Sequence, residues 1–70
     1  PRRVTLSVLV VDDDASVRET LVEFFETFGW TARGAASATD GRRLAAEHAP
    51  DVVLLDLRLP DADGLVALDA

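Results

Sequence analysis

The sequence predicts an α/β fold built on a doubly wound parallel sheet. Two short aliphatic runs, residues 8–11 and 52–55, each end abruptly in aspartate. Such runs are typical of strands that are buried on both faces of a parallel sheet. Helical patterns fill the sequence between the two runs, so both strands should point the same way. Their acidic ends are therefore expected at the same edge of the sheet.

The first strand is expected over residues 5–11, and a helix follows whose N-cap is either Asp14 or Ser16. Ser16 with Glu19 would form an S-x-x-E capping box. Apolar side chains recur at helical spacing, which predicts that one helix face packs on the sheet. They are Val17, Leu21, Phe24, Phe25 and Phe28. Gly29 suits the position just after the helix.

Residues 30–33 are expected to form a brief second strand, and this shortness favours an edge of the sheet. A second helix is predicted over residues 38–48, with Ser37 at its start. The third strand should cover residues 51–55. Proline, glycine and aspartates then indicate a loop, and a last helix starts near Leu65.

These elements predict one domain over residues 1–70, from strand 1 to the start of helix 3. It amounts to about three strands and two and a half helices. Right-handed crossovers place the first strand between the other two, as in the flavodoxin-like order 2-1-3-4-5. The third strand then has no outer partner. We expect either a longer native chain or completion by a homodimer or strand-exchanged dimer.

Composition excludes several classes of function. The 70 residues carry a formal net charge of -6, which argues against nucleic acid or an anionic membrane as a partner. Cysteine is absent, which excludes disulfide scaffolds and thiol catalysis. No apolar stretch approaches the roughly 18 residues of a membrane span. A cytoplasmic location is therefore expected.

Aspartates cluster after the two aliphatic runs: Asp12, Asp13 and Asp14 after the first, and Asp56 after the other. In open α/β sheets, ligands bind outside the carboxyl ends of the strands. Carboxylates that converge there would repel one another unless a hard cation such as Mg²⁺ neutralised them. The simpler interpretation is a solvated acidic loop in which one aspartate caps a helix.

Three pieces of sequence occur in order along nearly the whole chain. They are Val10-Val11-Asp12-Asp13-Asp14, Val17-Arg18 and Asp56-x-x-x-Pro60-x-x-Asp63-Gly64. Together they resemble the receiver domain of two-component response regulators. The resemblance implies a module that accepts a phosphoryl group from a histidine kinase and switches a downstream output such as transcription.

The resemblance also implies roles for individual residues. Asp56 matches the phosphoacceptor, which also contacts Mg²⁺. Asp13 matches a direct Mg²⁺ ligand, Asp12 one that acts largely through bound water, and Arg58 supplies its backbone carbonyl. Asp14 has no direct role in that pattern. Receivers also carry a serine or threonine and a lysine on later strands, which cannot be assigned in this sequence.

Two other functions stay open. A Mg²⁺-dependent phosphohydrolase of the haloacid-dehalogenase kind would resemble Asp-x-Asp-x-Thr after the strand. The corresponding residues here are Asp56, Arg58 and Pro60, so the second carboxylate is missing and we expect a signalling acceptor, not an enzyme. The chain could also be only a structural or dimerising module. Trp30 and the phenylalanines are expected in the core, and His48 should merely complement a helix dipole.

Overall fold

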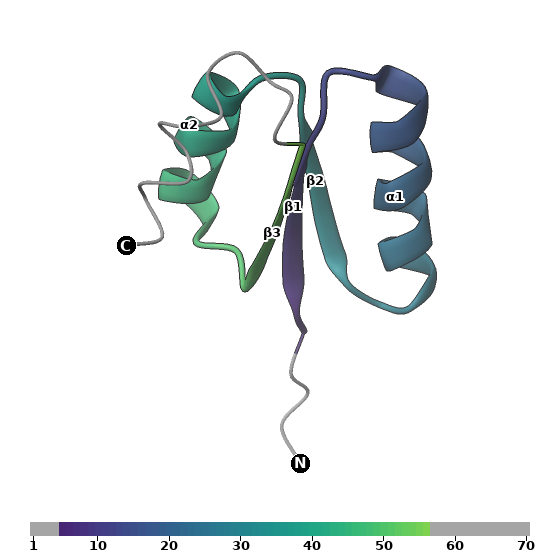
Figure 1. Cartoon of the computed structure of the whole chain (residues 1–70). Helices are drawn as coiled ribbons and strands as arrows, with labels where there is room; N and C mark the ends of the chain where they lie inside the picture. Colours follow the sequence, from purple (N-terminus) through teal and green to yellow (C-terminus); the bar gives the residue numbers. More distant parts are fainter. Residues whose placement is uncertain (1–4, 57–70) are drawn as a thin grey trace.

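The computed structural model describes residues 5–56. The elements in chain order are β1 (Ser7–Val11), α1 (Ala15–Thr27), β2 (Thr31–Ala35), α2 (Ala38–His48) and β3 (Val52–Leu55). They form three layers, with α1 on one face of the sheet and α2 on the other (Figure 1). The predicted α/β class is confirmed. Neither of these helices has the length and apolar character required to cross a bilayer.

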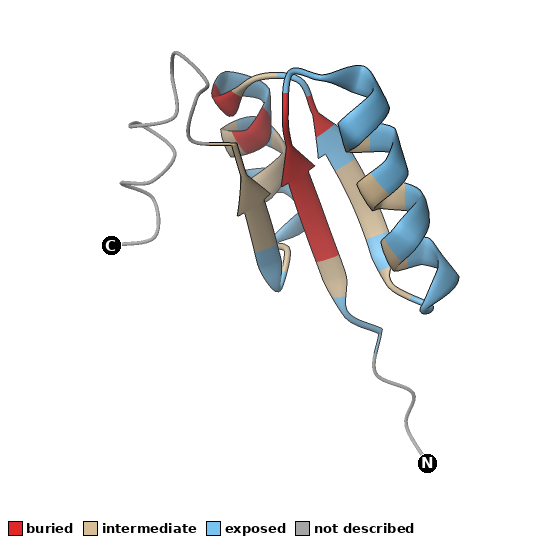
Figure 2. Ribbon diagram, turned by 45° about the vertical axis from the view of Figure 1, so that its right-hand side comes forward, coloured by how far each residue is buried: buried red, intermediate tan, exposed pale blue. Residues whose placement is uncertain are grey.

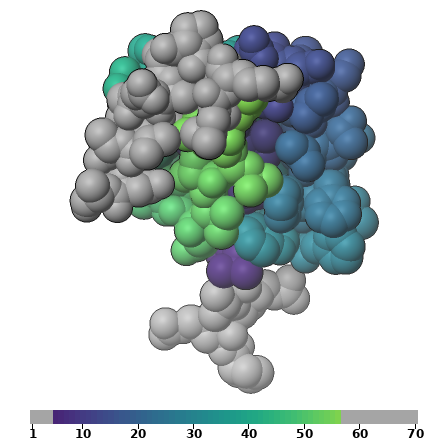
Figure 3. All heavy atoms as spheres, viewed as in Figure 1, coloured from purple at the N-terminus to yellow at the C-terminus, as the bar shows by residue number. Residues whose placement is uncertain are grey.

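The central strand of the sheet is β1. The strand order is β2-β1-β3 and both pairings are parallel. Val10 of β1 lies opposite Gly34 on one side and Leu54 on the other. This is the flavodoxin-like order predicted from right-handed crossovers. Within residues 5–56, β3 has no strand on its outer side, and its atoms, in green, lie at the surface in Figure 3.

The core is centred on β1, which is the buried strip in Figure 2. Val8, Leu9, Val10 and Val11 are each 1% exposed. Because side chains alternate along a strand, Leu9 and Val11 share one face, where they pack with Ala38 of α2. Val8 and Val10 face the side that α1 covers. A helix on each face explains why this strand is a continuous aliphatic run.

The N-cap of α1 is Asp14, whose Oδ1 accepts a hydrogen bond from the Val17 N–H at 3.1 Å. The alternative start, a capping box of Ser16 with Glu19, is wrong because Asp14 already satisfies this end of the helix. Gly29 follows the end of α1 with a φ of +85°, a conformation that a Cβ would strain. The expected role of this glycine is confirmed.

The remaining element bounds differ little from those expected. The second helix has the predicted range, and the Ser37 hydroxyl accepts a hydrogen bond from the Asp40 N–H at 3.1 Å. Strand β2 is an edge strand, as predicted, but it has 5 residues, the same number as β1. The predicted edge position is therefore confirmed, but the short length on which that prediction was based is wrong. The loop and helix expected after Asp56 lie outside the described residues.

The expected aromatic core is wrong for two phenylalanines. Phe24 is 53% exposed and Phe28 is 66% exposed, and no residue of α1 is buried against the described part of the chain. Phe25 and Trp30 are half-buried and their rings lie 5.1 Å apart. The physical reason is geometric: three strands contact only a narrow face of the helix, whereas its apolar side chains spread around a wider arc.

Asp51 is hydrogen-bonded to the sheet at the edge opposite the carboxyl ends of the strands. The Asp51 carboxylate accepts hydrogen bonds from the Ser7 N–H at 2.8 Å and from the Ser7 hydroxyl at 3.2 Å. In return, the Asp51 N–H donates to the Ser7 carbonyl at 3.0 Å. These contacts join the start of β3 to the start of β1. Asp51 therefore has a structural role.

Candidate metal centre

The carboxyl ends of β1 and β3 lie side by side, and each strand is followed by an aspartate. The Asp12 N–H donates to the Ala35 carbonyl and the Asp56 N–H donates to the Val11 carbonyl, both at 3.0 Å. Sheet hydrogen bonding thus continues for one residue beyond each strand. Because these backbones are held by the sheet, the two side chains are fixed at its carboxyl edge.

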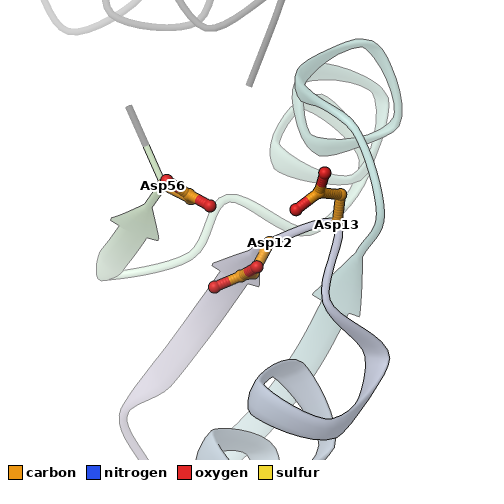
Figure 4. Close-up of side chains that lie close together, drawn as sticks. All are labelled: Asp12, Asp13 and Asp56. Carbon is orange, nitrogen blue, oxygen red and sulfur yellow. The ribbon is translucent and has the colours of Figure 1, made fainter. Parts of the chain in front are cut away.

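Asp12, Asp13 and Asp56 form the acidic cluster. One carboxylate oxygen from each residue lies within 4.8 Å of those from the other two. Figure 4 shows the three side chains around a common space, with Asp12 and Asp13 at the end of β1 and Asp56 at the end of β3. The predicted convergence of these aspartates is confirmed.

The three carboxylates differ in their surroundings. Asp12 is 9% exposed, Asp13 is exposed and Asp56 is half-buried. The Asp12 Oδ1 accepts a hydrogen bond from the Asp14 N–H at 2.9 Å, which orients that carboxylate. Asp14 itself uses a carboxylate oxygen to cap α1 and does not belong to the cluster. The capping role in the simpler interpretation therefore belongs to Asp14, whereas Asp12 and Asp13 are members of the cluster.

The donor set fits a hard divalent cation. Mg²⁺ binds oxygen ligands at about 2.0–2.1 Å in octahedral geometry, so two ligand oxygens are separated by about 3 to 4 Å. The three oxygens, within 4.8 Å of one another, need only a small adjustment to reach that spacing. Without a cation, like charges this close repel. The cluster could therefore hold a metal.

An apolar surface adjoins the cluster on the α1 side of the sheet. A hollow of about 220 Å³ includes Asp12 and Asp56 at its polar end. Its other walls are Val10, Val11, Leu21, Leu54 and Leu55. The carboxylates of Asp12 and Asp56 therefore lie at an open hollow that aliphatic residues border.

The other residues singled out in the sequence lie elsewhere. Arg58, the predicted backbone ligand, lies outside the described residues, and so do the Pro60 and Asp63-Gly64 matches. His48 is in the last turn of α2, 3.7 Å from Glu47, and is not part of the cluster. The receiver resemblance included Arg18 but gave it no role, although its guanidinium donates a hydrogen bond to the Asp12 carbonyl at 2.9 Å.

A parallel sheet with converging carboxylates at its carboxyl edge defines a doubly wound α/β protein with a candidate cation site. The family comparison is more specific, because the model of the response regulator receiver domain matches residues 8–70. The chain belongs to this family. Its acidic cluster resembles the phosphoacceptor site of receiver domains, which generally partner histidine kinases.

Individual relatives agree with this assignment. The chain is 41% identical over 61 residues to the transcriptional regulatory protein KdpE of Mycobacterium tuberculosis, covering 87% of this chain and 27% of the relative. It is 43% identical over 67 residues to protein-glutamate methylesterase/protein-glutamine glutaminase 2 of Pseudomonas aeruginosa, covering 91% of this chain and 19% of the relative. The chain thus spans about a quarter or less of these relatives.

A solved structure has the same fold. The N-terminal domain of an uncharacterized protein (WS1339) from Wolinella succinogenes superposes with a TM-score of 0.80 at 33% identity. The match covers 96% of this chain and 59% of the solved chain. The arrangement of strands and helices described above is therefore found in an experimentally determined protein.

Proposed function

We propose that this chain is a phosphoacceptor module in which Asp56 takes a phosphoryl group from a histidine kinase in the presence of Mg²⁺. The observation that carries the proposal is the convergence of Asp12, Asp13 and Asp56 within 4.8 Å at the carboxyl edge of the sheet. Family membership supports the choice of an aspartate acceptor, and the sequence resemblance places Asp56 at the acceptor position.

In the proposed step, the bonds that form and break belong to the Asp56 carboxylate and the phosphodonor. A carboxylate oxygen of Asp56 attacks phosphorus, the bond from phosphorus to the kinase histidine nitrogen breaks, and the nitrogen keeps the electron pair. A bound Mg²⁺ supplies charge neutralisation for the phosphoryl oxygens. Asp12 and Asp13 would hold that ion beside Asp56. The backbone hydrogen bond from Asp56 to Val11 keeps the nucleophile at the end of β3.

The product is an aspartyl phosphate that acts as a signal, so the proposed role is acceptance of one group, not multiple turnover. The output differs among relatives, because one is named as a transcriptional regulatory protein and another as a methylesterase. The relative named as a transcriptional regulatory protein supports transcription regulation as the output. Acceptance of the phosphoryl group is the part of the proposal that rests on residues of this chain.

The test is phosphoryl transfer from acetyl phosphate to the full chain, followed by intact-mass spectrometry. We expect the mass to increase by one phosphoryl group when Mg²⁺ is present, and hydroxylamine should remove it, because that reagent cleaves acyl phosphates. Chelation of the metal with EDTA should prevent the increase. Equal labelling with and without the metal would contradict the proposal.

A further inference from the structure

We propose that Arg18 is a positioning residue that orients the backbone of the acidic cluster. Gly34, which has no side chain, leaves the space that the Arg18 side chain occupies. The inference rests on the proposed function, since it concerns how the chain prepares the same Mg²⁺ site. Arg18 lies on α1 and its guanidinium Nη1 donates to the backbone carbonyl of Asp12 at 2.9 Å. It thereby joins the first turn of α1 to the end of β1.

The contact acts on the peptide group between Asp12 and Asp13. The Asp12 N–H is held by Ala35 at 3.0 Å and its carboxylate by the Asp14 N–H at 2.9 Å. The Arg18 hydrogen bond adds the carbonyl as a third fixed point. A peptide group is planar, so fixing this carbonyl also fixes the direction in which the chain enters Asp13. Arg18 therefore influences where the exposed Asp13 carboxylate lies.

Gly34 provides independent support for this role. Its φ lies outside the left-handed region, so its backbone conformation does not require glycine. A Cβ at this position would lie 2.9 Å from the Arg18 Cγ and 3.0 Å from its Cδ, closer than side-chain atoms normally approach. The aliphatic part of Arg18 thus crosses β2 where a side chain is absent. Space, not backbone strain, explains this glycine.

Whether Mg²⁺ binding weakens or tightens when Arg18 is replaced distinguishes a positioning role from a simple effect of its positive charge. If Arg18 acted only as a positive charge near three carboxylates, its removal would tighten Mg²⁺ binding, because repulsion of the cation would decrease. If it positions the peptide group, its removal should weaken binding. Groups that orient metal ligands typically change affinity by about 10–100-fold when they are removed.

The experiment measures Mg²⁺ affinity of the full chain by isothermal titration calorimetry, with thermal unfolding followed by circular dichroism. Arg18→Met keeps most of the aliphatic stem but removes the donor, and we expect about tenfold weaker binding. The Asp13 amide signal in the NMR spectrum should also move in the absence of metal. Arg33→Met removes one positive charge from β2 and is the matched control, which should not weaken binding.

A double-mutant cycle tests the role of Gly34. Gly34→Ala should weaken Mg²⁺ binding when Arg18 is present, because the new methyl group displaces its stem. In an Arg18→Ala background the same substitution should have no further effect. Unchanged or tighter binding by Arg18→Met would overturn the inference and leave the proposed function intact. Absence of Mg²⁺ binding by the parent chain would overturn both.

Discussion

Replacing Asp56 by asparagine is expected to abolish phosphoryl incorporation from acetyl phosphate. The substitution keeps nearly the same shape but removes the carboxylate that would attack phosphorus. It also removes one of the three charges whose oxygens lie within 4.8 Å of one another. The measurement is intact-mass spectrometry of parent and variant after incubation with Mg²⁺.

The matched control is Asp51→Asn, which makes the same chemical change at the opposite edge of the sheet. Asp51 contacts Ser7 and is not a member of the acidic cluster. This variant should still be phosphorylated, although its stability should decrease because charge-assisted hydrogen bonds are weakened. Incorporation that persists in Asp56→Asn would show that another residue is the acceptor.

Replacing Asp13 by asparagine should lower Mg²⁺ affinity by about tenfold or more. One unit charge at ligand-like distances contributes about 1 to 4 kcal/mol, depending on how strongly water screens it, and 1.4 kcal/mol corresponds to a factor of ten. Asp13 is exposed and forms part of the cluster, so the change should affect metal binding more than folding. Calorimetric titration with Mg²⁺ measures the difference.

Asp14→Asn is the control that shows whether Mg²⁺ binds to Asp13 as a specific ligand or is attracted by the local negative charge. Asp14 is adjacent in sequence but caps α1 through its Oδ1, and asparagine is about as good an N-cap as aspartate. This variant should therefore lose one negative charge, keep its helix and change Mg²⁺ affinity much less than Asp13→Asn. Equal losses in the two variants would mean that the local charge, and not a defined site, attracts the cation.

Most of the fold could be predicted because its signals are local. The aliphatic run of β1 and the cap at Ser37 are readable from neighbouring residues, and crossover handedness supplied the strand order. For the first helix, neighbouring residues left Asp14 and Ser16 as alternative caps. The surroundings of Phe24 and Phe28 could not be predicted in this way. Helical spacing identifies an apolar face, but the width of the surface that covers this face depends on which strands lie beside it.

The members of the candidate site could also be predicted from the sequence, but the contact that orients them could not. Parallel strands bring their carboxyl ends to one edge, so Asp12, Asp13 and Asp56 could be placed together from the sequence. The contact of Arg18 with the Asp12 carbonyl could not, because it depends on a side-chain path across β2. The signals in the sequence were Arg18 itself, as part of the receiver resemblance, and glycine at position 34, but a lone glycine in a strand has several explanations.

The most direct test of a cation site formed by three carboxylates is an NMR titration of the ¹⁵N-labelled full chain with Mg²⁺. The amide signals of Asp12, Asp13 and Asp56 should move together, saturate with a single affinity and return when EDTA removes the metal. The signals of Asp51 and Glu47 should move little. Small, unsaturable shifts spread over all the acidic residues would contradict the account.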